Sequence, residues 1–393
     1  MNILIVSSYY YPELGAASNR IQLMAEHLTK EGCKVEVLCP LPNYPSGKIF
    51  EKYRNKLIIS EYINNIKIFR HFIYPSNSSN SFLRILSMLS FALSLWLFAF
   101  RINLIKQKDL IIIQNSPLLV SFSANILFKL IYRKKTVLNV SDLWPLSGLE
   151  LGVFKKGFFY NFLEMVERRN YVLSDAFMGQ SNEILNFLEN FNDKPKFLYR
   201  NVPVNNNFSN SKKKKKFKII YAGLLGVAQE VFSIIKNVNF KKLGVEFHIY
   251  GDGAQKKSIK NYLLKNPKSN VYFHGSISKR ELMKILPDFH ASLIPLKSKI
   301  YGAVPSKIFE VISHGVPVIF SGDGEGAKII NDFSLGYCNT SGDYNLLSHN
   351  ISLLVNLEAN DYNTIKKNCI EVSKKEFNFK KQILSLKSFL LKL

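Results

Sequence analysis

The residue types with the clearest chemical role lie between Tyr301 and Ile319, in a polar loop followed by an apolar helical pattern. Pro305 and Ser306 are typical of the start of a helix. Lys307 then places a cation in the first turn, where the helix dipole favours an anion, and Glu310 follows about one turn later. The cation therefore indicates an anion nearby. A diphosphate meets that need, and Glu310 is then placed to accept hydrogen bonds from ribose hydroxyls.

Two glycines form a second candidate site between Tyr221 and Gln229. Gly223 and Gly226 come directly after an apolar strand pattern and before a helical one. A loop of this kind lets a phosphate reach backbone N–H groups at a helix N-terminus. A phosphate-binding loop and an ordinary tight turn both fit the pattern.

A similar loop, Pro12 to Arg20, follows the first apolar run of the chain. Ligands of open α/β sheets bind beyond the carboxyl ends of strands, and small residues let the backbone approach them. Gly15 and Ala16 are therefore candidate substrate contacts, with a structural turn as the alternative. The loop lacks the G-x-G-x-x-G spacing and so does not support a nicotinamide cofactor.

Strand and helix patterns alternate along the first half of the chain. The apolar run from Asn2 to Ser8 is followed by helical spacing from Ser18 to Glu31 and by a second run from Val35 to Cys39. A strand, helix, strand unit needs a crossover, which predicts a parallel sheet. Further buried strands are expected at Ile66 to Phe69, Leu110 to Gln114, Thr136 to Val140 and Ala176 to Met178. We predict a doubly wound α/β domain.

The pattern stops between Asn201 and Phe217, where Asn, Ser and consecutive lysines replace the apolar periodicity. A second α/β domain follows, with strands expected at Lys218 to Ala222, Glu246 to Tyr250, Asn270 to Phe273, Ala291 to Ile294 and Val316 to Phe320. We therefore predict domains at residues 1–204 and 217–378, a linker at 205–216 and a C-terminal helix at 379–393.

The composition agrees with a folded chain of two domains. Its 393 residues exceed one ordinary core, and 47% of them are hydrophobic. The formal charge of +24 indicates attraction to polyanions. No basic motif with interleaved aromatic residues is present, so nucleic-acid binding is not expected. The N-terminus has no basic region before its apolar run, which excludes a secretory signal and predicts a protein facing the cytoplasm.

One segment, Phe82 to Ile105, is unlike the strands and helices of a soluble domain. Its core from Ile85 to Phe100 carries no charge and is bounded by Arg84 and Arg101. At 1.5 Å per residue this core gives a helix of about 24 Å, shorter than the roughly 30 Å hydrocarbon layer. A helix lying in the membrane interface is favoured, with a buried core helix and a membrane span as alternatives. Basic residues cluster in this half of the chain, as at Lys52 to Lys56 and Arg101 to Lys108, and would add attraction to anionic lipid.

Taken together, the motifs resemble those of the retaining family-4 glycosyltransferases of GT-B fold. The resemblance is closest to the L-fucosamine and related N-acetylamino-sugar transferases of bacterial surface-polysaccharide clusters, and it covers nearly the whole chain. The apolar helix is also a feature of that subgroup. The matching segments are Tyr10 to Gly15, Pro42 to Lys48, Asp142 to Pro145, Arg200 to Pro203, Tyr250 to Gly253 and Val304 to Lys307.

The resemblance implies two facing Rossmann-like domains with a cleft between them and a donor site in the second domain. There Glu310 would hold the ribose, while Pro305, Ser306 and Lys307 would hold the diphosphate. Tyr250, Gly251 and His274 would lie near the base, and Gly15, Ala16, Gly223, Gly226 and Gln229 are further expected donor contacts. The family's Glu, seven residues, Glu pattern keeps only Glu310, because its first position is Gly302.

In other places the sequence lacks residues that the family uses, so a few remaining residues would have to take over their roles. The cations that many relatives carry after the first strand of the second domain align with Leu224 and Gln229, so phosphate charge rests on Lys307 and on Arg20. A His that contacts the donor's 6-hydroxyl in many relatives is replaced by Ser141, which fits a 6-deoxy sugar.

Asp142, beside this serine, is a candidate catalytic residue that orients the donor or the acceptor, and its alternative role is a helix cap. Glu13, Asn43 and Tyr44 are the expected acceptor contacts, although Glu13 also fits a structural loop carboxylate.

These observations predict a retaining glycosyltransferase that moves an N-acetylated, possibly 6-deoxy amino sugar from a nucleotide diphosphate, most simply UDP. The expected acceptor is a polyprenyl-diphosphate-linked saccharide of O-antigen or capsule synthesis, at the cytoplasmic face of the inner membrane. No cofactor or metal is expected, since Lys307 supplies positive charge at the leaving diphosphate. The alternatives are a nucleotide-sugar 2-epimerase on the same fold and a non-catalytic, membrane-docked scaffold.

Overall fold

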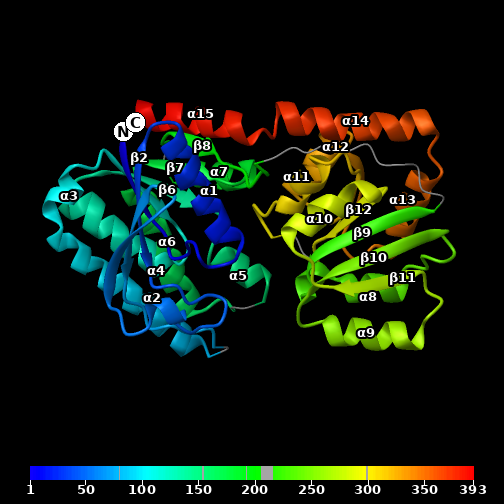
Figure 1. Ribbon diagram of the computed structural model, residues 1–393, viewed down its shortest axis with the longest axis horizontal. Helices are drawn as coiled ribbons and strands as arrows, with labels where there is room; N and C mark the ends of the chain where they lie inside the picture. Colours follow the sequence, from blue (N-terminus) through cyan, green and yellow to red (C-terminus); the bar gives the residue numbers. More distant parts are fainter. Residues whose placement is uncertain (79, 153–154, 192, 205–215, 298–299) are drawn as a thin grey trace. The chain divides into compact units, whose positions relative to one another are not determined.

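The computed structural model describes residues 1–78, 80–152, 155–191, 193–204, 216–297 and 300–393 (Figure 1). The chain forms two compact units. The first consists of Met1–Tyr199 with Lys381–Leu393, and the second of Arg200–Lys380. The expected linker at 205–216 lies outside the described residues except for Lys216.

The first unit is built on an eight-stranded sheet in the order β3-β4-β2-β1-β5-β6-β7-β8. All neighbouring strands are parallel except β3, which runs antiparallel to β4. The order reverses between β1 and β5, so the loops after these two strands diverge and leave room for a ligand. The strands are β1 Asn2–Val6, β2 Lys34–Pro40, β3 Ile58–Ile63, β4 Ile66–His71, β5 Leu110–Gln114, β6 Lys135–Val140, β7 Ala176–Gly179 and β8 Lys196–Leu198.

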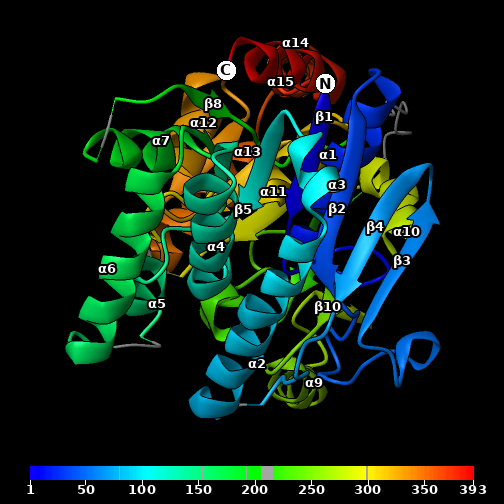
Figure 2. The same ribbon diagram turned by 90° about the vertical axis from the view of Figure 1, so that its left-hand side faces the viewer.

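Helices cover this sheet because its strands are apolar on both faces, as in other parallel sheets. Helix α4 packs between α2 and α6, and the three lie side by side over one face of the sheet (Figure 2). The helices are α1 Ala16–Lys30, α2 Ser81–Ser94, α3 Ile102–Lys106, α4 Leu118–Asn125, α5 Leu146–Glu150, α6 Phe158–Leu173 and α7 Asn182–Glu189. The C-terminal helix α15, Phe379–Lys392, also packs on this unit, where Lys387 Nζ donates to the carbonyl oxygen of Glu31 at 2.6 Å.

The sequence pattern predicted one continuous helix from Phe82 to Ile105. The structure divides this segment into three pieces. Helix α2 changes to a 3-10 helix at Leu95–Phe100, and Arg101 separates that from α3. Hydrogen bonds to the domain accompany the change. His71 Nδ1 lies 2.8 Å from the carbonyl oxygen of Ser94, and Trp96 Nε1 donates to Ser123 Oγ at 3.0 Å. These local contacts, which periodicity does not reveal, fix the second half of the segment against the domain.

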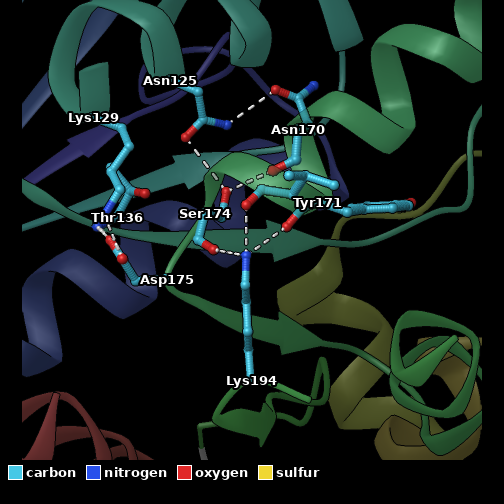
Figure 3. A network of polar contacts seen from close by, with 9 residues as sticks. Asn125, Lys129, Thr136, Asn170, Tyr171, Ser174, Asp175 and Lys194 are labelled. Atoms are coloured by element: carbon cyan, nitrogen blue, oxygen red, sulfur yellow. Dashed lines mark hydrogen bonds and ion pairs between the residues drawn. The ribbon is translucent and has the colours of Figure 1, made fainter. Parts of the chain in front are cut away.

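A polar network joins the amino ends of β6 and β7 to the end of α6 (Figure 3). Lys194 Nζ donates to the carbonyl oxygens of Tyr171, Val172 and Ser174. These carbonyls end a helix and have no partner within it, so the lysine both satisfies them and complements the helix dipole. Nearby, Asp175 accepts from the backbone N–H of Thr136 at 2.8 Å.

The second unit has a six-stranded parallel sheet in the order β11-β10-β9-β12-β13-β14. Its order reverses between β9 and β12. Its strands are β9 Phe217–Leu224, β10 Val245–Asp252, β11 Val271–Gly275, β12 Ala291–Pro295, β13 Val318–Ser321 and β14 Gly336–Asn339. Its helices are α8 Val231–Asn237, α9 Lys256–Lys265, α10 Lys279–Ile285, α11 Ser306–Ile312, α12 Glu325–Asp332, α13 Tyr344–Val355 and α14 Ala359–Lys375.

Candidate active site

The candidate donor site of the second unit lies where its strand order reverses, at the carboxyl ends of β9 and β12. Strand β9 continues past the predicted Ala222 to Leu224, so Gly223 lies within the strand and only Gly226 follows it. We call residues 223–226 the glycine loop. The connection after β12 leads into α11, which begins at Ser306. Lys307 extends from α11 to the glycine loop, because a Cβ on Gly223 would lie 2.4 Å from Lys307 Nζ. The two predicted motifs therefore meet, although they are far apart in sequence.

The end of β10 forms the next wall of this site. A Cβ on Gly251 would lie 1.9 Å from the carbonyl oxygen of Gly223, so only glycine permits this approach of the two strands. Beyond it, the backbone N–H of Leu225 donates to the carbonyl oxygen of Asp252 at 2.8 Å. These contacts fix the loops that follow β9 and β10 against each other.

Lys307 is a partly exposed cation with no ion pair in the described part of the chain. Burial lowers the pKa of its ammonium group, and the nearby carboxylate of Glu310 opposes that effect. A bound phosphate would add the missing negative charge. Lys307 is therefore suited to charge stabilisation at a diphosphate.

Glu310 lies one turn after Lys307 on α11, and its side chain is 22% exposed. Its Oε1 lies 2.9 Å from Nζ of Lys279, the first residue of α10. Lys279 was not predicted as a site residue. The capping box of Ser278 and Glu281 shows where α10 begins, but nothing in the sequence indicates that its first lysine reaches Glu310.

The expected base-binding residues form an aromatic stack on β10 and β11. The rings of Tyr250 and His274 lie 4.4 Å apart at an interplanar angle of 13°. His248 Nδ1 is 2.9 Å from His274 Nε2. Burial lowers the pKa of both imidazoles, which favours their neutral forms.

Gln229 ends the 3-10 turn Val227–Gln229 that directly follows Gly226. Its Oε1 is buried and has no hydrogen-bond partner among the described residues, and a Cβ on Gly226 would lie 2.7 Å from it. The glycine therefore leaves space for this side chain.

In the first unit, Glu13 has a structural role that the sequence left open. Its carboxylate is 3% exposed, and its Oε1 accepts from the backbone N–H groups of Asn43 and Tyr44 at 2.8 and 2.9 Å. Burial raises the pKa of Glu13, although these two hydrogen bonds oppose the rise. Glu13 thus positions the expected acceptor loop, with Gly15 beside the Tyr44 ring.

Arg20 of α1 lies at the carboxyl ends of β6 and β7, only 5% exposed. Its guanidinium donates to Ser141 Oγ at 2.8 Å, to Gln180 Oε1 at 3.2 Å and to the Asn139 side chain. Its Nε has no partner among the described residues. Ala16 begins the same helix, with Gly15 preceding it.

Asp142, which follows this network, is exposed and is not the N-cap of α5, a position that Pro145 holds. No group of three or more His, Cys, Asp or Glu side chains able to hold a metal occurs within the described residues.

Comparison with known proteins identifies the fold and the class. Residues 204–372 match the family model described as "Glycosyl transferases group 1". Sucrose-phosphate synthase from Thermosynechococcus elongatus has a similar structure, with a TM-score of 0.74, 14% identity, and coverage of 100% of this chain and 98% of that one. Anabaena HepE in complex with UDP gives a TM-score of 0.71 at 13% identity, covering both chains fully. No curated protein matches the sequence.

A third structure, the lipopolysaccharide outer core galactosyltransferase WaaB, gives a TM-score of 0.64 at 14% identity, with coverage of 100% of this chain and 99% of that one. The two Rossmann-like sheets and these similarities define a GT-B fold. The family match lies in the second unit and includes Gly223, Gly226, Lys307 and Glu310, and it identifies the activity. The protein is a glycosyltransferase.

Proposed function

We propose that the protein is a retaining transferase that moves an N-acetylated amino sugar from UDP to a polyprenyl-diphosphate-linked saccharide of O-antigen or capsule synthesis. The proposed donor site rests on one observation: the Lys307 side chain reaches Gly223 of the glycine loop. Glu310 lies one helical turn after Lys307 on α11. The loop leaves space for the diphosphate, Lys307 supplies positive charge, and Glu310 binds the ribose. HepE, a structure of the same fold, holds UDP.

In the proposed reaction the acceptor hydroxyl attacks the anomeric carbon from the face that the diphosphate leaves, and a diphosphate oxygen takes its proton. No enzyme nucleophile is required. Lys307 stabilises the negative charge that builds on the leaving diphosphate, and the bound geometry supplies proximity. Asp142, exposed at the end of β6, orients a substrate in this scheme. We further propose that no cofactor or metal takes part.

The donor sugar is proposed to be 6-deoxy. Ser141 stands where many relatives carry a His toward the 6-hydroxyl, and its Oγ accepts hydrogen bonds from Arg20 and, at 2.9 Å, from Gln114 Nε2. Both lone pairs of this oxygen are therefore used as acceptors within the first unit, so it cannot also accept a hydrogen bond from a 6-hydroxyl. A short, engaged side chain at this position favours a methyl group over a hydroxyl at C6.

The proposed location is the cytoplasmic face of the inner membrane, with α2 in the interface. By length and composition, one helical segment among the described residues, Phe82–Phe100, is sufficient to cross a membrane, but it is tied to the domain through His71 and Ser123. Only 28% of its window is buried. Its exposed apolar side chains are Phe82, Leu86, Leu89, Leu93, Trp96, Leu97 and Phe100, and α6 adds Phe158, Phe159, Phe162 and Met165.

Exposed apolar side chains on these helices, with Arg84 and Arg101 flanking the apolar segment in sequence, fit a monotopic contact with anionic lipid. Flotation of the protein with liposomes of 30% phosphatidylglycerol tests this step. Leu89→Glu with Leu93→Glu should abolish flotation, whereas the control pair Leu264→Glu and Leu346→Glu, exposed apolar residues of the second unit, should not.

The deciding experiment measures nucleotide release and sugar transfer by purified protein with a panel of UDP-, GDP- and dTDP-sugars. Detergent-solubilised polyprenyl-diphosphate sugar is present or absent, and Glu310→Ala is the comparison. Release that needs the lipid acceptor and is lost in Glu310→Ala supports the proposal. Acceptor-independent interconversion of the sugar would indicate a 2-epimerase instead, and no release from any donor would indicate a scaffold.

A further inference from the structure

A pocket of the first unit lies at the point where its strand order reverses. Ser8 and Tyr9 follow β1, and Pro117 follows β5, so the two diverging loops both line it. Helix α2 closes the opposite side with Ser87 and Phe91. Its volume is about 140 Å³, roughly ten times the space that a single water needs and enough for a sugar ring or a phosphate.

The walls of the pocket are held in place before any ligand binds. Glu13 binds the backbone N–H groups of Asn43 and Tyr44, as described above, and the rings of Tyr9 and Tyr44 meet edge to face at 5.8 Å. Asn77 Nδ2 donates to the carbonyl oxygen of Pro45 at 2.6 Å. A preformed pocket loses little entropy when a ligand enters.

The pocket contains polar groups that lack partners. Ser8 Oγ is buried and has no hydrogen-bond partner among the described residues. Arg84 is the one charged residue among the described residues that line the pocket, and within the described chain its guanidinium forms no ion pair. Its charge lowers the pKa of Tyr9, which burial otherwise raises. An arginine beside aromatic rings and an unpaired hydroxyl suits a sugar phosphate.

Helix α2 connects this pocket to the apolar surface. The same helix that turns Arg84, Ser87 and Phe91 to the pocket exposes Leu86, Leu89 and Leu93 elsewhere. A ligand that matches both faces carries phosphate and sugar at one end and a long hydrocarbon chain at the other.

We propose that this pocket binds the first sugar of a polyprenyl-diphosphate-linked acceptor, with the exposed Arg84 at its edge contacting the diphosphate and the prenyl chain lying along α2. The assignment rests on the proposed function and adds its acceptor site. Tyr9 and Tyr44 pack against the sugar, and Ser8 donates to it.

The test measures, by isothermal titration calorimetry, the binding of farnesyl diphosphate to the whole chain in detergent solution. Farnesol and inorganic diphosphate serve as partial ligands. Farnesyl diphosphate should bind more tightly than either, and Arg84→Gln should weaken its binding by roughly tenfold to a hundredfold, because a charge-assisted contact is lost. Ser87→Leu, which fills the pocket from α2, should weaken it as well, and thermal unfolding checks that both variants fold.

The matched control is Arg54→Gln, which removes the same charge from an exposed side chain paired with Glu51 outside the pocket. It should change affinity by less than about twofold. Equal losses in Arg54→Gln and Arg84→Gln would show a general charge effect and overturn the assignment, as would unchanged binding in Arg84→Gln. Equal competition by phosphatidylglycerol would assign the pocket to membrane lipid instead.

The experiments distinguish an error in the pocket assignment from an error in the proposed function. If sugar transfer occurs but Arg84→Gln leaves the acceptor KM unchanged, the pocket assignment is wrong and the function stands. If no UDP-sugar binds but farnesyl diphosphate binding still depends on Arg84, the function is wrong and the pocket stands.

Discussion

Lys279 Nζ lies 2.9 Å from Oε1 of Glu310, so the carboxylate proposed to bind ribose already has a cation as its partner. The lysine side chain is 60% exposed and the glutamate 22% exposed. Ion pairs this accessible to water contribute only about 0.2–1 kcal/mol. Ribose hydroxyls can therefore displace the ammonium at small cost.

This relationship predicts opposite effects for the two partners. Lys279→Met should strengthen UDP binding by about two- to fivefold, because the competing cation is removed. Glu310→Gln should weaken it by about tenfold or more, since hydrogen bonds to the charged carboxylate are lost. Calorimetric titration of UDP into each variant measures both effects. Weaker binding in Lys279→Met would mean that the lysine contacts the nucleotide itself.

A second prediction concerns the pH dependence of donor binding. Burial lowers the pKa of Lys307 below its ordinary value of 10.5 in the free protein, and a bound diphosphate favours the protonated form. Donor affinity should therefore begin to fall at a lower pH than for an ordinary lysine as the ammonium loses its proton. UDP affinity measured from pH 7 to 10 tests this, with Lys307→Arg as the comparison.

Arginine keeps its charge throughout this range, so the Lys307→Arg profile should be flat even if its affinity is lower. A fall of the same shape in Lys307→Arg would assign the pH dependence to another group.

The sequence predicted the sheets more completely than the sites. Strongly apolar strands such as Asn2–Val6 and Leu110–Gln114 were predicted because buried parallel strands are apolar on both faces. The edge strands β3, β8 and β14 were missed, since strands such as Lys196–Leu198 are short and only partly buried. In Ile58–Ile63 the burial alternates along the strand but the residue types do not, so β3 had no period-2 signal in the sequence.

The individual motifs of the site were visible, but their contacts were not. Lys307 and Gly223 could each be identified from local spacing, whereas their close approach depends on the strand order of the sheet. Arg84 and Lys279 carry no motif of their own. Their positions follow from the packing of α2 and α10, which a single sequence does not specify.

A third prediction uses the buried carboxyl group of Glu167 on α6. It is 3% exposed, its Oε1 accepts from Tyr171 at 2.6 Å, and burial raises its pKa from 4.5 to about 8. The folded state thus binds this proton more tightly than the unfolded state does. Its stabilising effect is complete below pH 4.5 and is lost as the pH rises toward 8.

Glu167→Gln should therefore raise the free energy of unfolding at pH 7 by about 2–3 kcal/mol and leave it nearly unchanged at pH 4. Glu164→Gln, one turn earlier on the same helix and paired with Arg168 at 3.5 Å, is the control and should change stability by less than about 0.5 kcal/mol. Urea unfolding at both pH values measures the difference. Destabilisation of Glu167→Gln at pH 7 would contradict a neutral carboxyl group.

The last prediction concerns Lys194, whose side chain binds the carbonyl oxygens at the C-terminal end of α6. Lys194→Met removes the donor for the carbonyl oxygens of Tyr171, Val172 and Ser174 (Figure 3) and the cation at the end of the helix dipole. Stability should fall by about 1–3 kcal/mol, because these carbonyls lose their partner and the helix end loses its charge. Lys196→Met is the matched control two residues later.

Lys196 forms an ion pair with Glu189 at 2.6 Å, but the carboxylate is 56% exposed. The control should therefore cost less than about 1 kcal/mol. Chemical unfolding monitored by circular dichroism compares the two variants. Lys194 is not part of either proposed substrate site, so the UDP affinity of the folded Lys194→Met protein should stay within about twofold of wild type. Equal losses of stability in Lys194→Met and Lys196→Met would show that Lys194 does not specifically stabilise the end of α6.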